Sequence, residues 1–271
     1  MAETVGPQAR YDGKVALVTG ASRGIGRALA LSMADLGADV IVTARTVEAR
    51  PDLAGTIVET AEAARARGRR AWPVAADLTA PGDVDALLAA AAGFGGVDVL
   101  VNNAAAMQPE MYDSLWAMTA PSWRYQLELN LTVPWVLTQR CALAMRSRGG
   151  GLVVNITSGP TGHSPNPDVV TDDARVGAAY LVSKVGVTQL TAALAPELAE
   201  FGIAVLALHP SHTRTENGLR LGPVGGYRMD RGHDIDLPVA VFEHLLTHDP
   251  AARSGQVVFA PDYAREHGLL G

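Results

Sequence analysis

Two side chains that can exchange a proton lie four residues apart in the second half of the chain. Tyr180 and Lys184 are the first and last residues of the segment YLVSK. On a helix this spacing places both side chains on one face. A tyrosine has an ordinary pKa near 10, and a neighbouring ammonium group favours the phenolate. We therefore expect a phenol that donates a proton to a carbonyl oxygen or accepts one from an alcohol.

A glycine-rich turn near the start of the chain can bind a phosphate group. The segment TGASRGIG (19–26) follows the apolar run KVALVT and precedes a helical pattern. Its glycines, Gly20, Gly24 and Gly26, let the backbone approach a pyrophosphate, and the helix N-terminus presents free N–H groups. A plain strand-to-helix turn would look the same in isolation, but strand before and helix after is the context of a dinucleotide site. No Gly-Lys-Ser/Thr closes the turn, which excludes a nucleoside-triphosphate loop.

The end of the second apolar run indicates which dinucleotide binds. An acidic side chain there would accept hydrogen bonds from a free ribose 2′-hydroxyl. Instead the run DVIVTA ends in Ala44 and is followed by Arg45, while Arg23 lies inside the glycine turn. Two guanidinium groups can bind a 2′-phosphate through forked hydrogen bonds. We predict a preference for NADPH over NADH; the alternative is two ordinary surface arginines.

Together these motifs resemble those of the short-chain dehydrogenase/reductase family, in its shorter-subunit branch. The spacing Thr-Gly-x-x-x-Gly-x-Gly at 19–26 is that branch's fingerprint, and NNAA at 102–105 is similar to its Asn-Asn-Ala-Gly motif with the last glycine replaced. Pro210 and Thr215 match a Pro-Gly-x-x-x-Thr segment in which Ser211 stands in place of the glycine.

The resemblance covers residues 11–262 and implies a catalytic set of four side chains. Tyr180 would be the general acid and base, Ser158 would donate a hydrogen bond to the substrate oxygen, and Lys184 would hold the nicotinamide ribose. Asn130 would hold a water that links Lys184 to solvent. Taken singly each residue has an ordinary alternative, such as a cap at Ser158 or a helix kink at Asn130.

The same resemblance implies an NADP(H) site, with Asp77 as the adenine contact. The residues predicted to bind the cofactor are Gly20, Ser22, Arg23, Gly24, Ile25, Gly26, Arg45, Thr46, Asp77, Leu78, Asn103, Ala104, Ala105, Tyr180, Lys184, Pro210, Thr213 and Thr215. The cofactor would carry the hydride. Bringing the pKa of Tyr180 to about 7 would require about 4 kcal/mol, part of it from Lys184 and more from an oxidised nicotinamide.

The elements that must position these residues alternate along the chain. Apolar runs of strand length occur at 14–19, 39–44, 71–75, 98–102, 151–157, 203–209 and 256–260, with helical patterns between them. Continuous apolar strands between helices indicate a parallel sheet covered on both faces. We therefore predict a doubly wound, Rossmann-type α/β domain with a mostly parallel seven-stranded sheet. Pro73 places the third strand at a sheet edge, because proline cannot donate to a ladder.

The predicted domain spans residues 11–262, with a flexible segment at 1–10 and a tail at 263–271. Two long helices are expected at about 122–147 and 178–201. The family usually pairs these helices, so the resemblance implies a homo-oligomer, a dimer or a tetramer. The stretch 44–57 also looks like hydroxysteroid-dehydrogenase-like members of the family.

The composition excludes several other classes of protein. Net charge is −6, which argues against a nucleic-acid surface. The N-terminal segment lacks the apolar run of a signal peptide, and no uncharged apolar stretch of 18 residues predicts a membrane span. Cys141 is the one cysteine, so no internal disulfide can form, and its apolar neighbours predict a buried side chain rather than a nucleophile. We expect a cytoplasmic protein.

Two segments depart from the family pattern. The interval between Ser158 and Tyr180 is longer than usual, and we expect it either to shape the substrate pocket or to be a surface insertion. The stretch 216–237 is short and rich in glycine, which suggests mobility or ordering by ligand. Met107, Pro160 and Leu219 are candidate apolar pocket residues.

The histidines have mainly ordinary interpretations. His244 and His248 have metal-ligand spacing, but a solvated helix face is favoured because no third ligand accompanies them. His209 and His212 flank the predicted cofactor end, where they contact substrate or serve only the fold.

Two other functions compete with a carbonyl reductase or alcohol dehydrogenase. A dinucleotide sensor on the same fold need not keep Ser158, Tyr180 and Lys184 together. A nucleotide-sugar epimerase or dehydratase would show Gly-x-x-Gly-x-x-Gly spacing and a larger substrate domain, neither of which this chain has.

Overall fold

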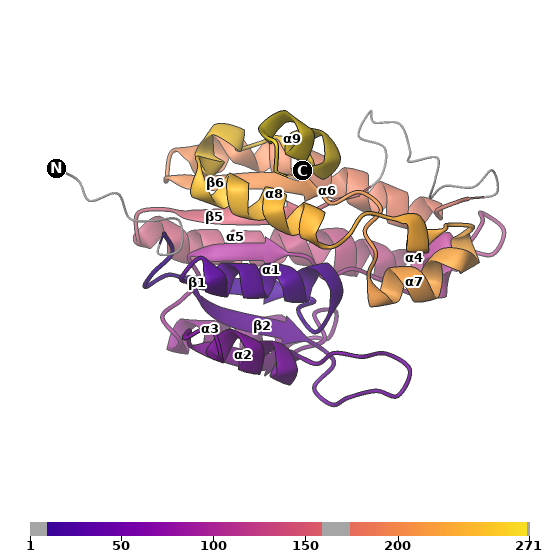
Figure 1. Cartoon of the computed structure of the whole chain (residues 1–271), viewed down its shortest axis with the longest axis horizontal. Helices are drawn as coiled ribbons and strands as arrows, with labels where there is room; N and C mark the ends of the chain where they lie inside the picture. The colour runs from indigo at the N-terminus through magenta and orange to yellow at the C-terminus, as the bar shows by residue number, and fades with distance from the viewer. Residues whose placement is uncertain (1–9, 159–173, 270–271) are drawn as a thin grey trace.

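Seven parallel strands form one sheet at the centre of the molecule (Figure 1). We used a computed structural model, which describes residues 10–158 and 174–269. The strand order is β3-β2-β1-β4-β5-β6-β7, and every pairing among them is parallel. The strands are β1 (Val15–Thr19), β2 (Asp39–Ala44), β3 (Ala71–Ala75), β4 (Val99–Asn102), β5 (Gly151–Ile156), β6 (Ile203–His209) and β7 (Val257–Phe259). The predicted doubly wound α/β fold is confirmed.

Helices cover both faces of this sheet. One face is packed by α1 (Gly24–Asp35), α2 (Ile57–Arg65), α8 (Asp236–Thr247) and α9 (Ala260–His267). The other is packed by α3 (Asp83–Gly93), α5 (Val133–Ser147) and α6 (Ala178–Ala199). Shorter helices lie near the carboxyl ends of the strands, namely η2 (Pro109–Tyr112), α4 (Ala120–Leu127), η3 (Glu128–Thr132), α7 (Glu216–Leu221), η4 (Gly222–Gly225) and η5 (Met229–Arg231). Another short helix, η6 (Pro250–Arg253), precedes β7.

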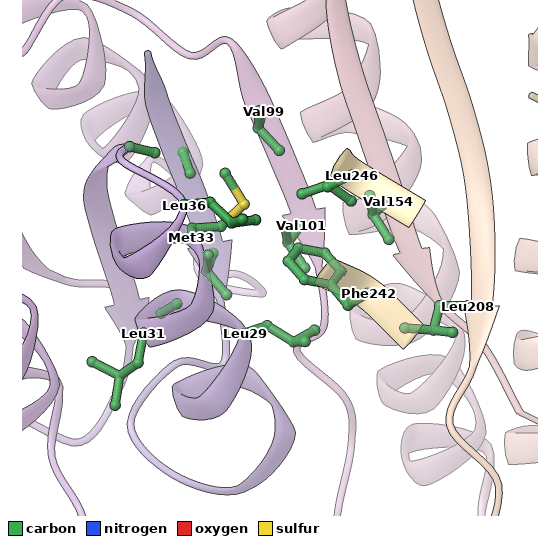
Figure 2. Packing of buried hydrophobic residues seen from close by; sticks show 14 of the residues in the cluster. Leu29, Leu31, Met33, Leu36, Val99, Val101, Val154, Leu208, Phe242 and Leu246 are labelled. Atoms are coloured by element: carbon green, nitrogen blue, oxygen red, sulfur yellow. The ribbon is translucent and has the colours of Figure 1, made fainter. Parts of the chain in front are cut away.

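The sequence of each strand divides its side chains between the two faces. In β1, Val18 packs with the α1 and α8 side, whereas Leu17 packs with the α3, α5 and α6 side. Figure 2 shows Met33 of α1 and Phe242 of α8 packed against Val101 on the first face. Phe242 is fully buried, and burial of such a side chain stabilises a fold by about 1.5–3 kcal/mol. Two apolar layers therefore hold the sheet in place.

Pro73 lies in β3, and β3 is an edge strand, as predicted. The free edge has no ladder partner, so the missing N–H of proline leaves no hydrogen bond unmade. Cys141 is also as expected: its side chain is 2% exposed, and burial raises the pKa of the thiol to about 12.

The predicted single helix at 122–147 is divided into three parts. A π-helical turn, η3, separates α4 from α5, and Pro134 lies in the first turn of α5. The helix accommodates this residue without an N–H directly after the π-turn, in which the N–H of Val133 donates to the carbonyl of Glu128. The apolar periodicity alone did not reveal the turn, which places Asn130 on its inner side.

The glycine-rich stretch 216–237 is folded into α7, η4 and η5. A Cβ at Gly225 would overlap the ring of Tyr112, and one at Gly222 would overlap Met229. The glycines therefore permit close packing of this stretch on the site.

The C-terminal boundary at residue 262 was placed too early. α9 continues to His267, and its Tyr263 and Ala264 are buried in the core. By length and composition alone α6 is apolar enough to cross a membrane, although it contains Lys184 and Glu197 and so is not the uncharged stretch whose absence the sequence showed. In this fold α6 packs against β6. Residues 1–9 of the predicted flexible segment 1–10 and the interval 159–173 lie outside the described residues.

Candidate active site

The carboxyl ends of the strands open into one large cleft. Figure 1 shows the strands pointing toward the side of the molecule where α4 and α7 lie. The cleft has a volume of about 970 Å³. Its lining includes Ser158 and all the residues predicted to bind the cofactor, from the glycine turn to Thr215. Asn130 is the one predicted site residue that does not line it.

The glycine turn has the shape of a phosphate cradle. Gly20 has φ +65°, and a Cβ there would lie 2.9 Å from Cα of Ala104. A Cβ at Gly26 would overlap Asn103 Nδ2 and Gly20 O. α1 begins at Gly24, so its unpaired N–H groups are presented to the cleft beside these glycines. The residues present therefore fit a dinucleotide pyrophosphate.

Thr19 joins the glycine turn to the loop after β4. Its hydroxyl oxygen accepts from the backbone N–H groups of Asn103 and Ala104, at 2.9 and 3.0 Å. Asn103 donates in return to the carbonyl of Thr19 at 2.8 Å. These bonds hold two walls of the cleft in a fixed relation.

Tyr180 and Lys184 lie in the first two turns of α6, on one face as predicted. The Lys184 ammonium is 6.0 Å from the centre of the Tyr180 ring. It donates to the carbonyl of Ile156 at 2.9 Å, and its residue is 4% exposed. Ser158, just after β5, forms a side-chain hydrogen bond with Tyr180. A phenol, a hydroxyl and an ammonium group therefore converge at one point of the cleft.

The electrostatics of this pair differ from the expectation. Burial raises the pKa of Tyr180 above its ordinary value, although the hydrogen bond with Ser158 acts in the other direction. Burial also lowers the pKa of Lys184 to about 8. The protein's own groups thus do not bring the phenol to a pKa near 7, because desolvation penalises the charged forms of both side chains.

Asn130 lies outside the cleft lining and hydrogen-bonds to residues next to it. It is 1% exposed and lies in the π-turn η3. Its amide oxygen accepts from the backbone of Ala106 at 2.8 Å, and its nitrogen donates to the Ser183 hydroxyl at 3.0 Å. Ser183 in turn donates to the carbonyl of Tyr180 at 2.7 Å. Asn130 therefore links the loop after β4 to the start of α6.

Arg23 supports the loop between β2 and α2. Its Nε and Nη2 donate to the carbonyls of Ala54 and Gly55, at 2.8 and 2.7 Å. The guanidinium group lines the cleft, but two of its donor nitrogens are already engaged. Its role in the structure is to hold this loop over the glycine turn.

Arg45 lines the cleft at the end of β2, with 56% of its side chain exposed. Its Nη1 lies 3.9 Å from Asp77 Oδ2 and donates to the Tyr125 hydroxyl at 3.2 Å. Desolvation opposes ionisation of Asp77, but hydrogen bonds from Thr79 and the charge of Arg45 hold its pKa below the usual value. An exposed cation and a carboxylate therefore lie together at this end.

The segment after β6 closes the far side of the cleft. Ser211 has φ +64°, a left-handed conformation that favours the glycine usual at this position of the family motif. Its N–H donates to His209 Nδ1 at 3.0 Å. His209 is 9% exposed and packs edge-on against Phe259. Thr215 caps α7 by accepting from the N–H of Gly218 at 3.0 Å.

Comparison with known proteins decides the family. A model of the short chain dehydrogenase family matches residues 14–222. The chain belongs to this family. Its recognition from the glycine turn and the Tyr-x-x-x-Lys segment is confirmed.

Three relatives illustrate how this short-chain dehydrogenase compares with others. It is 34% identical over 243 residues to a 3-oxoacyl-[acyl-carrier-protein] reductase of Synechocystis, covering 88% of this chain and 91% of the relative. It is 29% identical over 266 residues to human hydroxysteroid dehydrogenase-like protein 2, covering 96% of this chain but 59% of that protein. A metagenomic short-chain oxidoreductase solved in complex with NADP has a TM-score of 0.72 at 30% identity, covering 93% of this chain and 99% of that one.

Sequence reasoning missed two tyrosines of this dehydrogenase's cleft. Tyr112 and Tyr227 line it, and so does His212, for which substrate contact was one of the two expectations. Of the proposed apolar residues, Met107 lines the cleft, Leu219 is 48% exposed and does not, and Pro160 lies outside the described residues. The available signal was the run GPVGGY, whose glycines permit close packing around Tyr227.

The histidine pair of α8 belongs to a separate cluster. His244 Nδ1 lies 2.9 Å from the Tyr263 hydroxyl, and its ring stacks on His248 at 3.7 Å. Within residues 10–158 and 174–269, no group of three or more His, Cys, Asp or Glu side chains is arranged to hold a metal.

Proposed function

We propose that this chain is an NADP(H)-dependent oxidoreductase acting on carbonyl compounds or secondary alcohols. The reaction is transfer of a hydride between nicotinamide C4 and the substrate carbon, with Tyr180 as general acid and base. The observation that carries the proposal is the convergence of Tyr180, Ser158 and Lys184 with the glycine turn in one cleft.

Each of these side chains has a role that fits its position. The raised pKa of Tyr180 keeps the phenol protonated at neutral pH, so it can donate a proton to a carbonyl oxygen as that oxygen gains charge. Ser158 donates a hydrogen bond to the same oxygen. Lys184 binds the nicotinamide ribose, and its positive charge favours the phenolate form of Tyr180. When bound, the reduced nicotinamide supplies the hydride.

Asn130 acts in this proposal as a positioning residue as well as a holder of water. Its amide joins Ala106 to Ser183, which fixes the turn of α6 that carries Tyr180. A second N–H of the amide remains to hold a water for proton supply to Lys184.

The predicted reaction is tested by NADPH consumption against a panel of ketones and aldehydes. We expect oxidation of NADPH with at least one class of carbonyl compound. A dinucleotide sensor would bind NADPH and consume none with any member of the panel, and that outcome would overturn the proposal. The intact set of Ser158, Tyr180 and Lys184 favours the enzyme.

NADP(H) is the cofactor that we propose, on the strength of Arg45. Its exposed guanidinium can move from Asp77 to a 2′-phosphate, with Arg23 beside the glycine turn as a further cation. The NADP complex of the related metagenomic oxidoreductase supports this choice.

The cofactor preference is tested by calorimetric titration with NADPH and NADH. We expect NADPH to bind at least about 10-fold more tightly, because a charge-assisted hydrogen bond contributes about 1.5–3 kcal/mol. Arg45→Ala should remove most of that preference. Arg124→Ala, which removes an exposed charge next to Tyr125 and outside the cleft lining, should not. Equal or tighter binding of NADH by the wild type contradicts the choice.

We also propose a cytoplasmic homotetramer built on the α5 and α6 faces. Trp135 and Leu143 of α5 and Val182 and Val185 of α6 are 37–64% exposed. Apolar side chains gathered on two adjacent helices favour burial against another copy of the chain.

A further inference from the structure

The charged side chains that line the cleft gather at its glycine-turn end. Arg23 interacts electrostatically with Glu216, Arg50 and Arg220, and Arg45 faces Asp77 close by. Toward Tyr180 the described lining is uncharged apart from Lys184, whose ammonium is directed at the carbonyl of Ile156. The uncharged lining includes six aromatic or methionine side chains, together with smaller or amide side chains such as Gln108, Val176 and Ser211; the six are Met107, Met111, Tyr112, His212, Tyr227 and Met229.

Three of these side chains form a continuous aromatic wall: Tyr112, His212 and Tyr227. The rings of Tyr112 and Tyr227 lie 6.1 Å apart at 34°, and those of His212 and Tyr227 lie 5.6 Å apart at 30°. Tyr112 and Tyr227 each interact electrostatically with Tyr180, so the wall adjoins the reacting oxygen.

The wall is uncharged at neutral pH. Burial raises the pKa of Tyr112 to about 12 and also raises that of Tyr227. Burial, together with the charge of His233, lowers the pKa of His212 below 6.5. A carboxylate placed against these rings would lose its water without gaining a cation in exchange.

The backbone around the wall is shaped to hold it. Gly225 leaves room for the ring of Tyr112, which a Cβ would overlap. Gly177 lies against the carbonyls of Met111 and Asp113, at 2.8 and 2.9 Å from where its Cβ would be. Its N–H donates to Met111 at 2.7 Å. Segments from three parts of the chain therefore fix these rings beside Tyr180.

We propose that the aromatic wall selects substrates whose reacting carbon is attached to a flat, uncharged ring, that is, aryl ketones and their secondary alcohols. This inference rests on the proposed function, since it names the substrate class of the same site. A planar π-system gains offset or edge-to-face contacts with such rings, which a saturated ring of similar size does not. Three methionines, Met107, Met111 and Met229, line the same cleft and add polarisable surface.

Binding to the NADPH complex tests the substrate class without turnover. An alcohol and NADPH are both reduced, so no hydride transfer occurs between them, and calorimetry reports affinity alone. We expect 1-phenylethanol to bind at least about 5-fold more tightly than 1-cyclohexylethanol. 4-(1-Hydroxyethyl)benzoate should bind at least about 10-fold more weakly than 1-phenylethanol. Tighter or equal binding of either comparison compound overturns the proposal.

Two variants assign the selectivity to the wall. Tyr227→Leu and Tyr112→Leu should each bring the phenyl-to-cyclohexyl affinity ratio from about 5 to near 1, a change of about 1 kcal/mol. Val224→Ala, at a 55% exposed residue of η4 outside the cleft lining, should keep the wild-type ratio. A ratio unchanged in either folded leucine variant contradicts the assignment. Should one variant fail to fold, the other and the wild type decide.

The two proposals fail in different ways. Consumption of NADPH with aliphatic ketones but not aryl ketones contradicts the aromatic selectivity and leaves the oxidoreductase proposal standing. Preferential binding of 1-phenylethanol, with no NADPH consumption by any carbonyl compound, supports the selectivity and contradicts the reaction.

Discussion

Lys184 is a buried cation of the active site. Its burial lowers the stability of the folded chain. Its side chain is buried at the start of α6 with the carbonyl of Ile156 as its hydrogen-bond acceptor. Burial lowers the pKa of Lys184 to about 8, whereas an unfolded chain binds the same proton up to about 10.5. Below pH 8 the lysine is charged in both states, but only the folded chain removes that charge from water. This lowers the free energy of unfolding by about 3 kcal/mol.

Lys184→Met should stabilise the protein in the absence of nucleotide and abolish turnover. At pH 7 we expect the free energy of unfolding to rise by about 2 kcal/mol, since loss of the bond to Ile156 offsets part of the gain. Because wild-type stability rises as pH increases from about 8 to 10.5, the advantage of the variant should shrink over that range. Urea denaturation of both proteins between pH 7 and 10.5 measures this difference in the free energy of unfolding. An advantage that grows with pH contradicts this account.

At the same scale, the sequence was informative where spacing defines a motif. The pairing of Tyr180 with Lys184 and the cradle at Gly20 and Gly26 follow from local spacing, and the structure brings them to one cleft. Tyr112 and Tyr227 could not be found in this way, because they meet only through packing between segments far apart in the chain. The rise that burial causes in the pKa of Tyr180 could not be found from spacing either, since desolvation depends on the whole enclosure.

Elements are cross-linked by hydroxyl groups at the carboxyl ends of the strands. Thr19 and Thr43 are register partners on β1 and β2, and both are buried. The Thr19 hydroxyl oxygen accepts hydrogen bonds from the N–H groups of Asn103 and Ala104. The Thr43 hydroxyl has no hydrogen-bond partner among the described residues. Both threonines are buried, but the hydroxyl of Thr19 stabilises the fold whereas that of Thr43 destabilises it.

Replacing each threonine by valine separates these roles. Thr19→Val leaves two N–H groups unpaired and should lower the free energy of unfolding by about 2 kcal/mol. Thr43→Val removes an unpaired hydroxyl and should be neutral or slightly stabilising. Denaturation midpoints of the two variants under one set of conditions give the comparison. Equal destabilisation by both would show that the hydroxyl bonds of Thr19 contribute nothing particular.

The element pattern itself was largely predictable, with two exceptions of physical interest. Apolar runs identified all the strands, and Pro73 identified the edge. The π-turn at Glu128–Thr132 was hidden, because a helical period hardly changes when one residue is added to a turn. Ser211 was flagged as a departure from glycine, and its positive φ explains why glycine is usual there.

At the scale of the whole molecule, one apolar face is not covered by any of the residues 10–158 and 174–269. Arg146 lies over the ring of Phe201 at 4.0 Å, and a groove of about 230 Å³ beside them runs between α5 and α6. Leu143 stands at this groove, 64% exposed. The sequence predicted association only through its family resemblance, since a surface patch is assembled from separate helices and is not visible in either helix alone.

Leu143→Glu should reduce the assembly to a smaller species. A carboxylate at the centre of an apolar contact must lose its water without a partner, so association should weaken at least about 10-fold. Val224→Glu adds the same charge to η4, away from α5 and α6, and should leave the assembly unchanged. Sedimentation velocity at micromolar concentrations measures both. A wild type that sediments as a monomer contradicts the proposed oligomer.

The central claim is that Tyr180 transfers the proton in a cleft that binds NADPH independently of it. The most direct measurement is turnover and NADPH affinity in Tyr180→Phe, which removes one hydroxyl and keeps the ring. We predict an NADPH affinity within about threefold of wild type and a kcat reduced at least about 10²-fold, because general acid catalysis contributes about 10²–10⁴-fold and Tyr180 is the phenol that hydrogen-bonds Ser158. Turnover retained within tenfold of the wild-type rate would contradict the account.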